Sequence, residues 1–169
     1  MKASQLAGEE FLNRLSYYGQ SWLSARDLVL AALSGRENVD PSCRIILFDQ
    51  YCTWKACSIY CYLIGKLTVK QEHLFELEQE LSLPAANQPL YVVYPDEMGG
   101  NWRVQAIPVS PESFESRKAL PEPWRGIRDN ELSRLSGIEG CVFVHASGFI
   151  GGNKTKEGAL EMAQRALKI

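Results

Sequence analysis

The residues best suited to chemistry lie between positions 145 and 155, where His, Ser, Asn, Lys and Thr alternate with glycines. The residues before them, 140–144, are predicted to form a strand, and residues 154–167 a helix. A strand followed by a glycine turn and a helix start presents backbone N–H groups to an anion. The spacing alone leaves two interpretations open, an anion-binding site and a tight strand-to-helix turn.

This glycine-rich segment supplies most of the residues that we predict to bind substrate or phosphate. Its glycines let a ligand approach the backbone without a side-chain clash, and Thr155 is expected to cap the following helix. The spacing matches neither a Walker loop nor the dinucleotide-binding fingerprint. The residues assigned to the site from this segment are His145, Ser147, Gly148, Gly151, Gly152, Asn153, Lys154 and Thr155.

His145 is the side chain in this segment best able to transfer a proton or donate to a phosphate. No acidic partner lies near it in the sequence, so a hydrogen-bonded structural histidine is the alternative, and we assign no catalytic residue. The other histidine, His73, lies in an acidic stretch that is predicted to be helical, and we expect it on the surface.

A second candidate surface is basic and aromatic. Its cations, interleaved with Trp102 and Trp124, can form a groove for a phosphodiester backbone. Salt bridges to Glu112, Glu115 and Asp129 are the alternative use of the same charges. The cations concerned are Arg103, Arg117, Lys118, Arg125 and Arg128, of which Arg103 and Arg125 are assigned to the substrate site.

No metal site is predicted, because no carboxylates group with histidines as a two-metal hydrolase requires. Cys52, Cys57 and Cys61 lack the paired C-x-x-C spacing of structural zinc sites. Free thiols in a reducing compartment are therefore expected for the five cysteines.

Composition is typical of a globular domain, with 46% hydrophobic and 22% charged residues among 169. The net charge of −2 means that nucleic-acid binding needs a local basic patch. Residues 1–10 do not resemble a targeting peptide, and the apolar window 56–67 is too short to span a bilayer. We expect an intracellular protein that does not bind membranes.

The hydrophobic pattern predicts an α+β (α/β) fold. Residues 3–33 have a helical period, as one long helix or two in tandem. Strands are expected at 44–48, 90–94, 102–107 and 140–144, with the second and third forming a hairpin. Helices are expected at 72–81, 129–136 and 154–167. We therefore predict a helical linker or extension over 1–40 and a small mixed sheet with flanking helices over 41–169.

Several runs resemble the C-terminal half of the Myg family, which is named after a melanocyte proliferating gene and catalogued as metal-dependent protein hydrolases. The longest are SFESRKALPEPWRGIRD at 113–129 and LSGIEGCVFVHASGFIGGNKTKEGAL at 135–160. Shorter matching runs are EEFLNRL at 9–15, WK at 54–55 joined to EHLF at 72–75, and NWRVQ at 101–105. Residues 56–71 interrupt this pattern and are predicted to be an insertion that packs poorly.

The Myg family is similar to the DHH phosphoesterases, and the resemblance implies a 3′→5′ RNA exonuclease of the nucleus and mitochondrion. It implies that Mn or Mg is held by an N-terminal domain, so we expect this chain to bind no cofactor. It also implies that the present residues form the substrate-binding domain. The position of Asn153 can be His in relatives, and Asn does not exchange protons at neutral pH.

Two functions are therefore expected from different classes. The first is the substrate-binding part of an exonuclease, which binds single-stranded RNA or a nucleotide weakly and is inactive alone. The second is a non-catalytic interaction or regulatory module that docks on a catalytic domain or associates with itself.

Overall fold

The computed structural model of the chain describes residues 3–16, 23–50, 72–96 and 100–169. The predicted insertion at 56–71 lies outside these residues. The described α-helices are α1 (Ala3–Ser16), α2 (Leu23–Ser34), α3 (Arg36–Val39), α5 (Glu72–Glu80), α6 (Asp129–Ser136) and α7 (Lys156–Lys168). The described 3-10 helices are η2 (Ala85–Asn87) and η3 (Glu122–Trp124).

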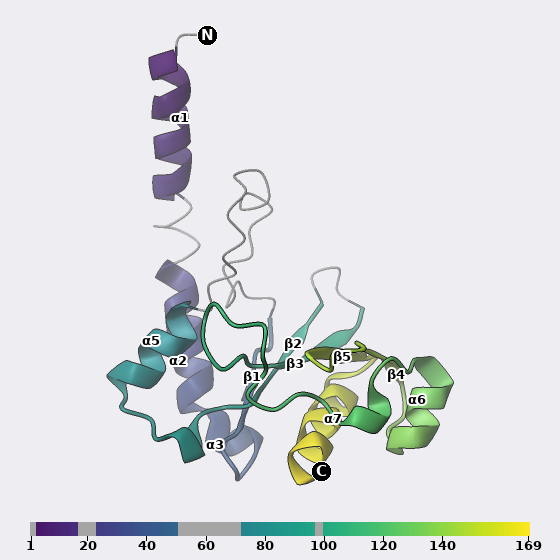
Figure 1. Cartoon of the computed structure of the whole chain (residues 1–169). Coiled ribbons are helices and arrows are strands. Elements are labelled where there is room, and N and C mark those ends of the chain that lie inside the picture. The colour runs from purple at the N-terminus through teal and green to yellow at the C-terminus, as the bar shows by residue number, and fades with distance from the viewer. Residues whose placement is uncertain (1–2, 17–22, 51–71, 97–99) are drawn as a thin grey trace.

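A five-stranded mixed sheet forms the centre of the fold, in the order β1-β2-β3-β5-β4. β1 pairs with β2 in parallel, and the other neighbours are antiparallel. The predicted α+β fold with a small mixed sheet is confirmed (Figure 1). The strands are β1 (Ile45–Leu47), β2 (Tyr91–Pro95), β3 (Trp102–Ala106), β4 (Cys141–Val144) and β5 (Ile150–Asn153).

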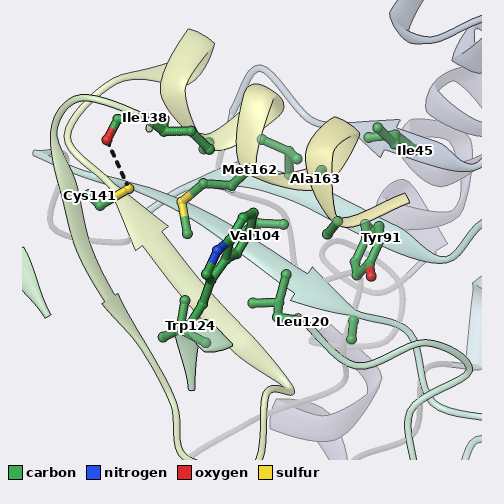
Figure 2. Close-up of a cluster of buried hydrophobic side chains, with 14 of the residues drawn as sticks. Ile45, Tyr91, Val104, Leu120, Trp124, Ile138, Cys141, Met162 and Ala163 are labelled. Atoms are coloured by element: carbon green, nitrogen blue, oxygen red, sulfur yellow. Dashed lines mark hydrogen bonds between the residues drawn. The ribbon is translucent and has the colours of Figure 1, made fainter. Parts of the chain in front are cut away.

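One face of the sheet packs on α7. The side chains Met162 and Ala163 of this helix are fully buried against Val104 and Tyr91 of the sheet (Figure 2). The long connection between β3 and α6 adds further apolar side chains to the same core, including Trp124. The period of α7 accounts for this, because its apolar residues recur every three or four positions.

On the other face of the sheet, the cover formed by the described helices lies at the β1–β2 end. There α2 and α5 pack against Ile46 and Val92, and their own buried residues include Leu33 and Leu74. In β3, Val104 and Gln105 face opposite sides of the sheet, as successive residues of a strand do. Beyond β2 this second face carries polar and aromatic side chains.

The glycine segment differs from its prediction. Residues 150–153 form the strand β5, which lies between β3 and β4, and the turn before it is confined to residues 145–149. The predicted strand-to-helix turn was therefore wrong, and the chain makes a β-hairpin before α7 begins. Glycine is a weak strand former, so propensity gave no sign of a strand here.

The N-terminal residues form two described helices, α1 and α2. Figure 1 shows α1 standing away from the sheet, whereas α2 lies against α5 and β1. Phe11, Leu12 and Leu15 of α1 are 64%, 62% and 58% exposed. The boundary at residue 40 stays a prediction, although α2 contributes Val29 and Leu33 to a buried cluster.

Candidate substrate site

The turn between β4 and β5 gathers the exposed polar residues of the predicted site. The hydroxyl of Ser147 lies 2.9 Å from His145 Nδ1, and the backbone N–H of Ser147 donates to the same nitrogen at 3.2 Å. Because a backbone N–H can only donate, Nδ1 is an acceptor, and the neutral ring carries its proton on Nε2. His145 therefore presents one N–H donor at an exposed turn.

The turn is held rigidly by its own residues and by the connection before α6. Gly148 has a φ of +73°, donates its N–H to His145 O at 2.8 Å and is buried. The ring of Phe149 meets the His145 ring edge-on at 4.8 Å between centroids. A side chain at Gly148 would have both an unfavourable backbone conformation and a clash, so glycine is required there.

Arg125 lies directly behind this turn. A Cβ atom on Gly148 would lie 2.7 Å from Arg125 Nε, which donates to Leu120 O at 2.9 Å. The structure thus brings His145, Ser147, Gly148 and Arg125 together, as a cationic side chain beside an exposed turn. Four of the predicted site residues therefore lie together at this turn.

Gly151 and Gly152 have another role. As part of β5 they pair with β3 on one side and β4 on the other. Their backbone groups face neighbouring strands rather than a ligand. A Cβ on Gly151 would meet Leu120 and Val144 at 3.1 Å, and one on Gly152 would lie 2.7 Å from Arg103 Nη1. Both glycines therefore leave room for neighbouring side chains.

Asn153 is fully buried and organises the start of α7. Its Nδ2 donates to Glu139 O at 2.8 Å, and its Oδ1 accepts from the backbone N–H of Thr155 at 3.0 Å. Thr155 in turn accepts from Gly158 N at 3.0 Å, which confirms the predicted helix cap. The Asn153 side chain is therefore fully engaged inside the protein, whereas Lys154 is exposed beside it.

Arg103 lies on the second face of the sheet, away from Arg125 and the turn of residues 145–149. Its Nη2 donates to Asp96 at 2.5 Å, and its guanidinium lies 5.2 Å from the centroid of the Phe143 ring. Arg128 lies 5.9 Å from the same centroid. Phe143 was not among the predicted site residues, because a phenylalanine in a predicted strand usually belongs to a core.

The remaining predicted basic residues are used internally. Arg117 donates to both carboxylate oxygens of Glu78 at 2.7 Å, and Lys118 donates to Leu167 O at 3.0 Å. The single groove predicted for all five cations is therefore not what the structure shows. Glu78 replaces the acidic partners that were considered for Arg117, because α5 folds back onto this connection.

His73 is buried, with 1% of its surface exposed, so the prediction of a surface histidine was wrong. It lies on the buried side of α5 together with Leu74 and Leu77, whereas the acidic residues Glu76 and Glu80 are exposed. The acidic composition of this helix concealed its buried side.

Three or more His, Cys, Asp or Glu side chains do not come together anywhere in the described ranges in a way that could hold a metal ion. The described residues thus offer no donor set that fits a divalent metal. Cys43 and Cys141 are free thiols, and the three cysteines considered for zinc lie outside the described ranges.

The mixed sheet, with α7 on one face and a polar hairpin turn at one end, defines an α+β domain with an exposed candidate anion site. The chain belongs to the MYG1 exonuclease family, described as Uncharacterised protein family (UPF0160), whose model matches residues 1–167. This confirms the resemblance predicted from the sequence.

Curated relatives match nearly the whole chain. It is 50% identical over 167 residues to "MYG1 exonuclease" of Homo sapiens, covering 98% of this chain and 39% of the relative. It is 47% identical over 166 residues to "MYG1 protein" of Dictyostelium discoideum, covering 98% and 45%. It is 49% identical over 167 residues to "MYG1 exonuclease" of Bos taurus, covering 98% of this chain and 39% of the relative.

The chain spans about two fifths of the length of these relatives. No solved structure matches it. Among the described helices, none combines the length and apolar character needed to cross a bilayer.

Proposed function

We propose that this chain is the substrate-binding portion of a MYG1-type, DHH-like RNA exonuclease that works in the 3′→5′ direction. Its ligand is single-stranded RNA or a nucleotide, bound through phosphate at the turn of residues 145–149. Family membership and relatives named exonuclease support a nucleic acid as the ligand. The nucleus and mitochondrion are the locations that we propose, from the family resemblance.

The observation that carries this proposal is the arrangement around His145. Two contacts from Ser147 set its tautomer, so that Nε2–H is the donor that remains. Arg125 lies behind the same turn and contributes positive charge. A hydrogen-bond donor and a cation at an exposed turn favour the binding of a phosphate. The negative net charge of the whole protein does not oppose this, because the charge close to the turn is positive.

We further propose that this chain does not hydrolyse RNA alone and that Mn or Mg is held by other parts of a full-length relative. The family resemblance supports this, because it implies a metal centre in an N-terminal domain of the family. What the present residues contribute is binding and orientation: His145 Nε2–H donates to a phosphate oxygen, and the turn fixes the position of that donor.

The test is binding of a fluorescein-labelled oligouridylate of about ten nucleotides, followed by anisotropy at about 50 and 200 mM salt. We expect salt-sensitive binding by the full chain and an affinity lowered roughly tenfold in His145→Ala. Asn130→Ala, an exposed polar position of α6, is the matched control and is expected to bind like the wild type. Binding that is unchanged in His145→Ala contradicts the placement at the turn.

Hydrolysis is measured separately, with the same oligonucleotide and added manganese or magnesium. We expect no shortening of the RNA by the pure chain. Processive shortening from the 3′ end would show that the described residues are not the whole of the functional unit and that the chain carries its own metal centre.

A second function, an interaction module, is favoured by one observation. α1 exposes Phe11, Leu12 and Leu15 on a helix that stands away from the sheet (Figure 1). Such a face is typical of a surface that another protein chain covers. Light scattering distinguishes the two: a salt-insensitive dimer that has no affinity for RNA favours the interaction module, and an RNA-binding monomer favours the first proposal.

A further inference from the structure

Five residues form one row across the second face of the sheet. Tyr94 pairs with Arg103, Arg103 with Gly152, and Gly152 with Phe143. An isolated bridge from Phe143 to Arg128 extends the row by one position beyond β4. Directly paired residues project to the same side of a sheet, so these residues share a face.

This row begins where the helical cover of the face ends. Tyr94 is the last of its members to pack against the cluster made by α2 and α5. At the far end Arg128 is exposed, and Phe143 is half-buried. α7 packs on the opposite face, against Val104. Among the described helices, α2 and α5 pack on this face at its β1–β2 end, and Arg128 at the far end of the row is exposed.

Gly152 makes the centre of the row possible. The place of a Cβ atom at this position lies 2.7 Å from Arg103 Nη1 and 3.2 Å from Phe143 Cε1. Arg103 and Phe143 therefore lean over the glycine from both sides and reach each other, with 5.2 Å between the guanidinium carbon and the ring centroid. Any larger residue would separate them.

Two guanidinium groups thus contact one aromatic ring, since Arg128 lies 5.9 Å from the same centroid. A guanidinium that stacks by its face keeps its N–H donors in the plane, where they can bind an anion in bidentate fashion. The side chain of Arg128 makes no hydrogen bond or ion pair with any of the described residues, although its carbonyl oxygen accepts from the backbone N–H of Leu132 at 3.1 Å. For Arg103, Nη2 is paired with Asp96, whereas Nη1 is buried without a hydrogen-bond partner in the described part of the chain.

Two like charges beside one ring repel each other unless an anion lies between or beside them. The single acidic side chain that pairs with this group is Asp96, and it pairs with Arg103 alone among the described residues. The row therefore has an excess of positive charge together with unused donors, in a protein whose net charge is −2. A negatively charged ligand would neutralise the excess positive charge and accept hydrogen bonds from the unused donors.

We propose that Phe143 holds Arg128 and Arg103 in place as a second phosphate-binding point, which takes an internal phosphodiester of single-stranded RNA. Phe143 is a positioning residue, and Arg128 supplies most of the contact because it is the exposed cation. This inference rests on the proposed function. His145 follows Phe143 by two positions, about 7 Å along a strand, so one short oligonucleotide can reach both points.

The test uses the same labelled oligouridylate, without terminal phosphates, and the full chain. Arg128→Gln is expected to weaken binding several-fold and to reduce the slope of log affinity against log salt by about 0.7, the value for one phosphate contact on a single strand. Arg134→Gln, an exposed arginine of α6, is the matched control and is expected to leave the slope closer to that of the wild type.

Phe143 is tested by Phe143→Leu and Phe143→Tyr. Leucine keeps an apolar side chain but removes the ring face, so affinity should fall although Arg128 remains. Tyrosine keeps the ring and should restore binding, which a merely structural role shared by Leu and Tyr would not predict. If Phe143→Leu does not fold, as judged by thermal unfolding, Arg128→Gln decides the matter alone because its side chain is exposed.

The outcomes separate the two proposals. If His145→Ala weakens binding but Arg128→Gln and Phe143→Leu bind like the wild type, the second phosphate point is wrong and the proposed function stands. If the wild type binds no RNA even at low salt, both are wrong. If an equal concentration of unlabelled uridine monophosphate displaces the probe fully, the point binds terminal phosphate rather than an internal phosphodiester, and the inference is overturned.

Discussion

At the scale of single residues, Gly158 has no room for a side chain. A Cβ atom there would lie 2.3–2.5 Å from three atoms of the buried Asn153 amide. Gly158→Ala must therefore displace Asn153 and disturb the hydrogen bonds that start α7, and we expect it to destabilise the protein by about 1–3 kcal/mol. Urea unfolding measures this directly.

Gly100→Ala is the matched control, because nothing lies within 4 Å of a Cβ atom at that position. It should change the free energy of unfolding by less than about 0.5 kcal/mol. Equal stability of the two variants would show that the Asn153 side chain moves away without cost, and that the cap of α7 does not depend on it.

Tyr91 gives a second prediction at this scale, because burial raises the pKa of its hydroxyl above the ordinary value. In the unfolded chain the hydroxyl ionises near pH 10, whereas in the folded protein it stays protonated to higher pH. The unfolded state therefore loses the proton first. The contribution of the protonated Tyr91 hydroxyl to the free energy of unfolding is complete below about pH 10. It decreases as the pH rises towards the pKa of the folded state.

Tyr91→Phe should remove this dependence on alkaline pH. Its free energy of unfolding should fall less than that of the wild type between about pH 9 and 11, since a phenylalanine has no proton to lose. Other tyrosines and lysines titrate in both proteins, so the comparison between the two isolates Tyr91. If the free energies of unfolding of the wild type and Tyr91→Phe changed with pH in parallel, the Tyr91 hydroxyl would be open to solvent at high pH.

The sequence showed the residue types of the site but not their grouping. His145, Ser147 and Gly148 could be predicted because polar residues and a glycine after a strand indicate an exposed turn. The role of Asn153 could not, because its partner Glu139 O belongs to the turn before β4, and sequence spacing does not place the two together. Phe143 was missed for a similar reason, since its contacts come from β3 and residue 128.

At the scale of elements, an ion pair joins α5 to the connection that follows β3. Arg117 and Glu78 have side chains 10% and 3% exposed and share two hydrogen bonds of 2.7 Å. Removing one partner leaves a buried, unpaired charge, so Arg117→Met should cost about 3–5 kcal/mol. The double variant with Glu78→Met should recover much of that loss in a double-mutant cycle.

Arg26 and Glu80 form the matched control pair between α2 and α5. Their side chains are 31% and 57% exposed, so solvent screens the interaction and Arg26→Met should cost less than about 1 kcal/mol. If Arg117→Met and Arg26→Met lowered the free energy of unfolding by the same small amount, the Arg117 pair would be no more important for stability than a surface pair.

Most elements could be predicted because their patterns are local. The hairpin of β2 and β3 follows from alternating residues on both sides of a polar turn, and α6 and α7 follow from their helical periods. β5 could not be predicted, because its sequence IGGN lacks the branched residues that favour strands. It forms a strand because β3 and β4 offer hydrogen bonds on both sides, and this pairing is a property of the tertiary fold.

At the scale of the whole molecule, the apolar side chains of α2 and α1 differ in burial. Leu33 of α2 is fully buried, whereas Leu15 of α1 is 58% exposed. We expect Leu33→Ala to destabilise the protein by about 2–5 kcal/mol and Leu15→Ala to change stability by less than about 0.5 kcal/mol. Thermal or urea unfolding of dilute protein provides the comparison.

Dilution matters for this comparison, because a chain that associates through α1 would gain stability with concentration. A large loss in Leu15→Ala at low concentration would show that α1 packs within its own chain. A loss that appears only at high concentration would instead support the interaction module.

The position of β5 has a consequence for synthesis of the protein. This strand is made after its neighbours β3 and β4, yet it separates them in the sheet. During translation, the edge of β3 that pairs with β5 therefore stays unpaired until residues 150–153 leave the ribosome. Such edges can pair with other nascent chains. A premature stop just before β5 would release a polypeptide that contains most of the core sequence but retains two open strand edges, a substrate for chaperones rather than a smaller folded protein.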